Sequence, residues 1–227
     1  MIWCAEIGSM HKGDKSLAFE LIRQAKQSGA TIAKFQFGWT DDAQKKYAGN
    51  INPIRYVDDW AEDLKRWCDY FDIELMASIW SIEGLETARR IGMKRYKIAH
   101  QMRDERLIAE ILSDGKETFF SNDEENDEPH IKHIFCSPHY PCYPEQVNIP
   151  DFYPRGWYYG YSDHTHGIEA CLLAVARGTQ YIEKHFCLDK ADLVVRDTPF
   201  SATPQEFAEM VRIGNGISRL LSVQEKL

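Results

Sequence analysis

The sequence predicts an α/β fold, a (β/α)8 TIM barrel with a trimmed outer ring of helices. Short apolar runs alternate with helical patterns along the whole chain, which is typical of parallel strands joined by crossover helices. We count eight such runs, the number of strands that closes a TIM barrel. The chain has 227 residues, somewhat fewer than the about 250 of a typical barrel, so we expect one domain over residues 1–227 with some shortened connections.

The predicted elements follow one another in the order that a barrel requires. The strands lie near residues 2–7, 31–37, 73–79, 95–99, 117–121, 131–136, 156–161 and 180–186. The helices lie near residues 14–28, 56–71, 81–91, 103–113, 166–177 and 204–221. Thr203-Pro204-Gln205-Glu206 forms a capping box with proline at the first helical position, and Gly178 is placed to end the preceding helix. The apolar stripe of that preceding helix consists of Ile168, Cys171, Leu172, Val175 and Ala176.

Two connections indicate that the fifth and sixth helices are shortened or missing. Residues 121–129, after the fifth strand, contain five acidic residues within six positions and no apolar stripe, which predicts a solvated loop. Residues 138–154, after the sixth strand, contain five prolines and are expected to be irregular, with at most one short turn. The outer ring of the barrel is therefore incomplete on this side.

Composition and charge exclude several classes of protein. The formal net charge of -8 argues against a surface that binds nucleic acid or an anionic membrane. No apolar run approaches the about 20 residues of a membrane span, and the N-terminus enters a strand without a signal-peptide pattern. The six cysteines are scattered without a CxxC motif, so we expect reduced, buried thiols. These features predict a cytoplasmic protein.

Two histidines stand at neighbouring strand ends. His164 follows the seventh strand, and His185 closes the eighth. Because one crossover helix joins these parallel strands, both imidazoles lie at the same edge of the barrel. A single histidine is more often a core residue than a metal ligand, but a pair at matching strand ends favours a metal site.

Further polar residues follow the other predicted strands, where TIM barrels place their catalytic groups. Lys34 and Lys97 interrupt apolar strands, and burying an ammonium is unfavourable unless an anion meets it. With the hydroxyls nearby, they predict a phosphate or carboxylate pocket. The alternative is that they form structural ion pairs with Glu6 or Glu183. The full set of strand-end residues is Glu6, Lys34, Gln36, Ser78, Lys97, His100, Ser121, Ser137, His139, Ser162, Asp163, His164, Glu183 and His185.

Short motifs occur in a fixed order over nearly the whole chain. They are Ala5-Glu-Ile-Gly8, His11-Lys-Gly-Asp14, Ala33-Lys-Phe-Gln36, Tyr96-Lys-Ile98, Tyr161-Ser-Asp-His-Thr165, Gly167-Ile-Glu169, Ile182-Glu-Lys-His-Phe186 and Arg196-Asp-Thr-Pro-Phe-Ser201. In this order and spacing the chain resembles the barrel domain of the N-acetylneuraminate (sialic acid) synthase family. That family condenses phosphoenolpyruvate with the open-chain aldehyde of an N-acyl hexosamine, forming a nonulosonic-type 2-oxo acid and phosphate.

The resemblance implies a role for each candidate residue. A divalent metal, typically Mn2+ with Mg2+, Co2+ or Zn2+ as other options, would bind His164 and His185. The implied phosphoenolpyruvate ligands are Lys34, Ser78, Lys97, Ser121 and Ser162, and Glu6 and Asp197 would engage the acyl-amino sugar. We therefore predict catalytic roles for Glu6, Lys34, Lys97 and Asp197. We predict substrate binding by Ser78, His100, Ser121, Ser162, Asp163 and Glu183.

The chain also departs from the family pattern. Ala99-His-Gln-Met102 stands where the family carries Gly-Ser-Gly-Glu, so His100 would replace a serine as an anion donor. Pro138 falls on a family asparagine and offers no side-chain hydrogen bond. The family's C-terminal antifreeze-like domain, through which its barrels commonly dimerise, is expected to be absent, although a homodimer is still an expected assembly. Two alternatives stay open, namely a lapsed synthase that only binds phosphoenolpyruvate or a sugar, and a metal-dependent aldolase or lyase.

Overall fold

Eight parallel strands close into a barrel, as the sequence predicts. The computed structural model describes residues 1–39, 57–122 and 131–224. Each strand is hydrogen-bonded to the next, and the last pairs with the first. The strands are β1 (Ile2–Glu6), β2 (Ile32–Phe37), β3 (Glu74–Ile79), β4 (Tyr96–Ile98), β5 (Thr118–Asn122), β6 (Ile131–Cys136), β7 (Gly160–Asp163) and β8 (Tyr181–His185).

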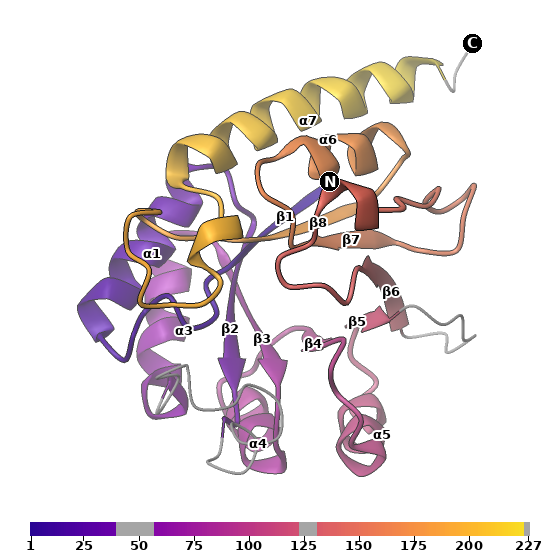
Figure 1. Ribbon diagram of the computed structural model, residues 1–227. Helices are drawn as coiled ribbons and strands as arrows, with labels where there is room; N and C mark the ends of the chain where they lie inside the picture. The colour runs from indigo at the N-terminus through magenta and orange to yellow at the C-terminus, as the bar shows by residue number, and fades with distance from the viewer. Residues whose placement is uncertain (40–56, 123–130, 225–227) are drawn as a thin grey trace.

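Helices pack around this barrel (Figure 1). Asp14, Ser81 and Asp104 cap three of them by accepting hydrogen bonds from backbone N–H groups of the first turn. The predicted capping box before the last helix is present, because Thr203 N donates to Glu206 Oε2 at 2.8 Å and Glu206 N donates to Thr203 Oγ1 at 3.4 Å.

The α-helices are α1 (Lys15–Gln27), α3 (Ala61–Tyr70), α4 (Ile82–Arg90), α5 (Glu105–Ser113), α6 (Glu169–Ala176) and α7 (Pro204–Gln224). The short 3-10 helices are η1 (Val57–Trp60), η2 (Pro144–Gln146) and η3 (Thr198–Phe200).

The outer ring is trimmed where the sequence indicates. Between β6 and β7 the chain is irregular except for η2, and no described helix lies beside β6 in Figure 1. The acidic stretch at 123–130, predicted as a loop in place of the fifth helix, lies outside the described residues, as does residue 56, where the second helix was predicted to begin. The described helices thus agree with a barrel that has lost part of its outer layer.

Two local predictions are wrong. The seventh strand runs over Gly160–Asp163 rather than 156–161. The residues before it, from Trp157, are rich in aromatics that favour strands, but Trp157 instead stacks on His133 with ring centroids 3.9 Å apart. In α6, Ala176 is exposed and Ala174 is buried in its place.

The barrel interior is divided into an apolar floor and a polar upper part. Side chains alternate between the interior and the surrounding helices along each strand. The floor is a buried apolar cluster formed by Cys4, Ile32, Met76, Phe119, Ile134 and Tyr181. Two residues further along the strands, the inward positions become polar, as at Glu6, Lys34 and Ser78. The floor closes one end, so the polar groups line a cavity at the carboxyl ends of the strands.

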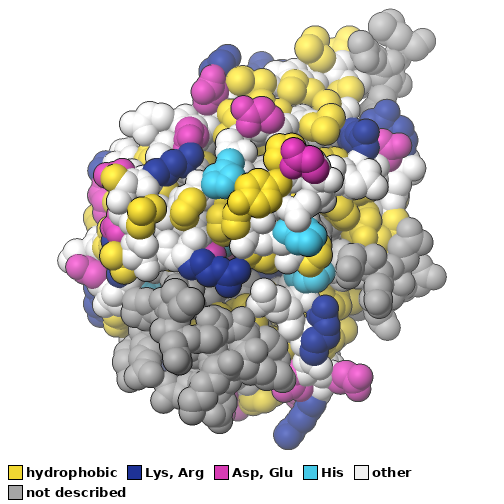
Figure 2. All heavy atoms as spheres, in the orientation of Figure 1, with side chains coloured by type: hydrophobic (Ala, Val, Ile, Leu, Met, Phe, Trp, Pro, Cys, Tyr) yellow, Lys and Arg dark blue, Asp and Glu magenta, His cyan; other side chains and the backbone are white. Residues whose placement is uncertain are grey.

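The surface carries mixed charge. On the face shown in Figure 2, basic and acidic side chains are interspersed rather than gathered in one basic patch. All six cysteines are buried and free of disulfide bonds, as expected. Within residues 1–39, 57–122 and 131–224, no helix is both long and apolar enough to cross a membrane.

Candidate active site

A cavity of about 100 Å³ opens at the carboxyl ends of the strands. Every strand contributes to its wall, as do the loops that follow β2, β3, β4, β6, β7 and β8. Of the residues given a role by the resemblance, all except Asp163 line it, whereas the strand-end candidates Ser137 and His139 do not. The lining residues are Glu6, Lys34, Gln36, Trp39, Ser78, Trp80, Lys97, Ala99, His100, Gln101, Ser121, Cys136, Tyr140, Ser162, His164, Glu183, His185, Arg196 and Asp197.

Lys34 forms the ion pairs that were predicted as the alternative to anion binding. Its Nζ lies 2.6 Å from Glu6 Oε2 and 3.6 Å from Glu183 Oε1, and it donates a hydrogen bond of 3.0 Å to Ser78 Oγ. Burial alone would lower the pKa of Lys34, but the carboxylates of Glu183 and Glu6 outweigh burial and raise it. Lys34 is therefore a compensated cation.

Lys97 has different surroundings. Its Nζ donates to Ser121 Oγ at 2.6 Å and to the carbonyl oxygen of Ile98 at 3.0 Å, and it forms no ion pair with a carboxylate of the described chain. Burial lowers the pKa of Lys97, and the longer-range attraction of Glu183 offsets this only in part. Lys97 thus places a buried ammonium beside a hydroxyl in the cavity without a local counter-charge.

The two carboxylates that share Lys34 have opposite protonation preferences. Burial alone would raise the pKa of Glu183, but Lys34, Lys97 and hydrogen bonds from Tyr181 and Ser162 lower it to about 2. For Glu6, burial dominates over the attraction of Lys34 and raises the pKa. Because like charges this close disfavour double ionisation, Glu183 holds the negative charge and Glu6 is the site that more readily carries a proton.

Glu6 is also connected to the mouth of the cavity. Gln36 Nε2 donates to Glu6 Oε1 at 3.0 Å, and Trp39 Nε1 donates to Gln36 Oε1 at 2.6 Å. Trp39 stacks on Trp80 with ring centroids 4.5 Å apart. This chain of contacts fixes the carboxylate and forms an aromatic wall on the β2 and β3 side of the cavity.

The histidines of the seventh and eighth strands come together at the rim of the cavity. His164 directly follows β7 and His185 ends β8, and their ring centroids are 5.4 Å apart. Burial, reinforced by the nearby His185, lowers the pKa of His164 well below its ordinary value, so this imidazole is neutral at neutral pH. Tyr140 covers His164, with ring centroids 3.8 Å apart.

These two imidazoles fit a divalent metal as part of its ligand set. Neutral imidazole is a ligand for borderline ions such as Zn2+, while oxygen donors such as water and carboxylate suit Mn2+. In the described chain, no group of three or more His, Cys, Asp or Glu side chains is arranged to hold an ion. Among the described residues, the two imidazoles are therefore a partial ligand set, and oxygen donors would suit its remaining positions.

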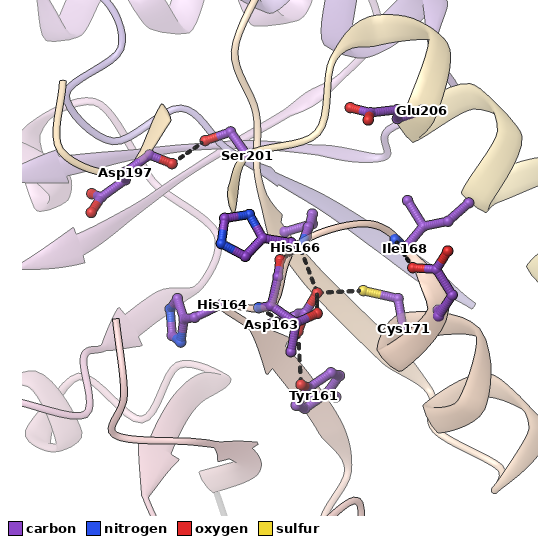
Figure 3. Close-up of polar contacts among 12 residues, drawn as sticks. Tyr161, Asp163, His164, His166, Ile168, Cys171, Asp197, Ser201 and Glu206 are labelled. Carbon is purple, nitrogen blue, oxygen red and sulfur yellow. Dashed lines mark hydrogen bonds and ion pairs between the residues drawn. The ribbon is translucent and has the colours of Figure 1, made fainter. Parts of the chain in front are cut away.

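Asp163 does not line the cavity, which corrects its predicted role in substrate binding. Figure 3 shows its carboxylate turned toward Tyr161 and Cys171, on the opposite side of the strand from His164. It is fully buried and forms an ion pair of 2.5 Å with Lys184 Nζ. The outward position follows from strand alternation, because Ser162 and His164 take the inward positions on either side.

The residues that depart from the family pattern differ in where they lie relative to the cavity. His100 and its neighbours Ala99 and Gln101 form part of the cavity wall, while Met102 is buried. His100 therefore lies at the cavity rather than in the core. Pro138, by contrast, is exposed and outside the lining.

Several lining residues were not predicted. Tyr140 lies in the proline-rich loop, where no periodicity marks a functional position. Arg196 stands beside the predicted Asp197, with its guanidinium carbon 5.7 Å from the Tyr140 ring centroid. Trp39 and Trp80 closely follow the ends of β2 and β3. This short distance in the sequence could have marked them as residues of the site.

The chain is similar in sequence and in fold to known synthases. The chain is 26% identical to human N-acetylneuraminate-9-phosphate synthase, over 98% of this chain and 71% of the human protein. It is also 26% identical to the pseudaminic acid synthase of Campylobacter jejuni, over 91% of this chain and 71% of that one. The crystal structure of N-acetylneuraminic acid (sialic acid) synthetase from Leptospira borgpetersenii, in complex with citrate, is similar with a TM-score of 0.84 at 26% identity, covering 97% of this chain and 84% of that one.

The family is shown by a match that extends over most of the chain. A family model described as the NeuB family matches residues 21–124 and 122–226, which include seven of the eight barrel strands and most of the cavity wall. The chain therefore belongs to the NeuB family.

Proposed function

We propose that the protein condenses phosphoenolpyruvate with the aldehyde of an N-acyl hexosamine, or a related aldehyde, to give a nonulosonic-type 2-oxo acid and phosphate. The relatives with this barrel include synthases of N-acetylneuraminate 9-phosphate and pseudaminic acid. The single observation that carries the proposal is Lys97, a buried ammonium that lines the cavity and forms no ion pair with a carboxylate of residues 1–39, 57–122 and 131–224.

The anion site would be built around Lys97 and its neighbours. A buried cation is stabilised when an anion meets it, and phosphoenolpyruvate supplies both a phosphate and a carboxylate. Ser121 offers a hydroxyl donor, Ser162 donates its hydroxyl to Glu183 at 2.8 Å beside it, and His100 lines the same cavity. Lys34 is neutralised by Glu6 and Glu183, so it contributes less net attraction than Lys97.

Glu6 is the group best suited to move a proton. In the reaction, C3 of phosphoenolpyruvate bonds to the aldehyde carbon, and the aldehyde oxygen takes up a proton. Glu6, with its raised pKa and its contact to Gln36 at the cavity wall, would donate that proton. Water then adds to C2, the C2–O bond to phosphate breaks, and a ketone remains.

His164 and His185 would hold the divalent metal, with Mn2+ proposed first. When bound, such an ion acts as a Lewis acid toward the aldehyde oxygen. Asp197 and Arg196 at the open side of the cavity would bind the polar groups of the acceptor. Tyr140, which packs on His164, would limit the entry of water from that side.

The test is phosphate release from phosphoenolpyruvate in the presence of Mn2+ and a panel of N-acyl hexosamines and simple aldehydes. Release that requires an aldehyde supports the proposal. No release across the panel contradicts it. Phosphoenolpyruvate binding without turnover would instead indicate a binding protein, and cleavage of a phosphorylated sugar without phosphoenolpyruvate would indicate an aldolase or lyase.

A further inference from the structure

A second, buried polar layer lies directly behind the two histidines. Strands β7 and β8 pair in parallel, with Ser162 opposite Glu183 and Asp163 opposite Lys184. Ser162 and Glu183 face the cavity, so the side chains of Asp163 and Lys184 face outward, between the barrel and α6. Both outward side chains are 0% exposed, and Lys184 Nζ lies 2.5 Å from Asp163 Oδ2.

The carboxylate of Asp163 is the centre of a closed hydrogen-bond network. It accepts from Tyr161 OH at 2.8 Å, Thr165 N at 3.0 Å, Thr165 Oγ1 at 3.1 Å and Cys171 Sγ at 3.3 Å (Figure 3). Lys184 Nζ also donates to the carbonyl oxygen of Thr165. The network therefore ties the end of β7, the residue after His164, β8 and α6 to one another.

This network holds the residues that flank both histidines. Asp163 precedes His164 and Thr165 follows it, while Lys184 precedes His185. A shift of either strand end along its axis would separate the charges, which is strongly unfavourable because both are fully buried. The distance between the two imidazoles is thus linked to the Asp163–Lys184 ion pair.

Stability alone is a poor reason for these charges. Replacing a buried ion pair by apolar groups of similar volume is often neutral or stabilising. The pair is fully enclosed and does not contact the cavity, so it neither binds substrate nor improves solubility. The effect that remains for the ion pair is to hold the adjoining ends of β7 and β8 in a fixed position.

We infer that Asp163 and Lys184 are positioning residues whose ion pair sets the spacing of His164 and His185, so that both imidazoles reach one divalent cation. The inference rests on the metal site of the proposed function. It assigns to the outward layer a role in metal affinity, although neither residue touches the metal or the substrate.

The test compares metal binding and stability in a charge-neutral double variant, Asp163→Asn with Lys184→Met. Asn keeps the size and an oxygen acceptor for Tyr161 and Thr165, and Met fills the space of the lysine stem. We expect the Kd for Mn2+, measured by calorimetry, to rise about 10–100-fold, as is usual when groups supporting a metal ligand are lost. We also expect an altered absorption spectrum of bound Co2+ and a near-normal melting temperature.

Matched variants separate the possible outcomes. Removal of the exposed Lys65–Asp69 ion pair on α3, as Lys65→Met with Asp69→Asn, should leave the Kd unchanged. If the Asp163→Asn, Lys184→Met variant folds and keeps the wild-type Kd for Mn2+ and the wild-type Co2+ spectrum, the positioning role is overturned. The metal site itself would stand. Failure of the wild type to bind Mn2+ overturns the metal site itself, and the inference with it. If the double variant does not fold, Thr165→Val, which deletes one hydrogen bond of the network, should raise the Kd by a smaller factor, and no rise overturns the inference.

Discussion

The ammonium of Lys34 lies 2.6 Å from Oε2 of Glu6, inside the barrel, where both side chains are almost completely closed off from water. Lys97 lies in the same cavity, but its local partners are the Ser121 hydroxyl and a backbone carbonyl. The two lysines therefore differ in their local charge. Lys34 belongs to a charge network with Glu6 and Glu183, and in the proposed function Lys97 is the cation that would meet a bound anion.

This difference predicts effects of unequal size on stability. Lys34→Met leaves Glu6 and Glu183 without their shared cation, so the free energy of unfolding should fall by about 3–5 kcal/mol. Lys97→Met removes a buried charge that has no ion-pair partner among the described residues, so the free energy of unfolding should change by at most about 1 kcal/mol. Urea unfolding with Lys65→Met as a surface control checks both values, and an equal loss in the two cavity variants would refute the distinction.

The lowered pKa of Lys97 predicts that phosphoenolpyruvate binding weakens early on the alkaline side. Binding needs the charged ammonium, which is present below the pKa of Lys97 and is lost as the pH rises through it. Because burial lowers this pKa, affinity should fall at a pH below the ordinary lysine value of 10.5. Calorimetry at increasing pH should also show proton uptake on binding. Affinity that stays constant up to about pH 10 would contradict this account of the anion site.

Glu6→Gln tests the proposed proton donor. The substitution keeps the size of the side chain and an oxygen that faces Gln36. We expect kcat to fall about 100-fold or more, while the KM for phosphoenolpyruvate changes little. In the wild type, kcat should decrease as the pH rises through the raised pKa of Glu6, and this limb should disappear in the variant. Equal kcat and an identical pH profile in both proteins would exclude Glu6 as the donor.

His11 predicts a pH dependence of stability outside the cavity. Its ring is fully buried against Phe35 and Trp60, and burial lowers its pKa to about 4. The unfolded chain binds a proton near pH 6.5, whereas the folded chain does so only near pH 4, so stability present above pH 6.5 is lost as the pH falls toward 4.

The measurement is urea unfolding at pH 7 and pH 4.5 for the wild type and for His11→Gln. The wild type should lose about 2 kcal/mol more than the variant between these two values. His164 and the other titrating groups are common to both proteins, so their contributions cancel. Equal losses of stability in the wild type and in His11→Gln would mean that the His11 imidazole is protonated in the folded state as readily as in the unfolded chain.

The fold and most of the cavity could be predicted because the alternation of strand residues is a local property. Once Lys34, Lys97 and Glu183 are placed on strands, their inward direction follows from their neighbours. The error at Asp163 has the same origin. With the seventh strand placed over 156–161, Asp163 falls in a loop, where no alternation specifies its direction, whereas in the structure it is the last residue of β7.

The remaining features depend on contacts between distant segments. Trp157 favours a strand by its residue type, yet its ring packs on His133 of β6. Tyr140 reaches the cavity from an irregular loop, and the loop's path is set by packing rather than by a repeat in the sequence. The difference in ion pairing between Lys34 and Lys97 likewise depends on side-chain distances, which no sequence pattern specifies.

The most direct measurement of the proposed condensation is the mass and yield of the product formed from phosphoenolpyruvate and an N-acyl hexosamine in the presence of Mn2+. We expect a 2-oxo acid whose mass is that of the acceptor plus pyruvate, formed in equal amount to the released phosphate and only when both substrates are present. Phosphate released without the acceptor, or no such product with any aldehyde of the panel, would contradict it.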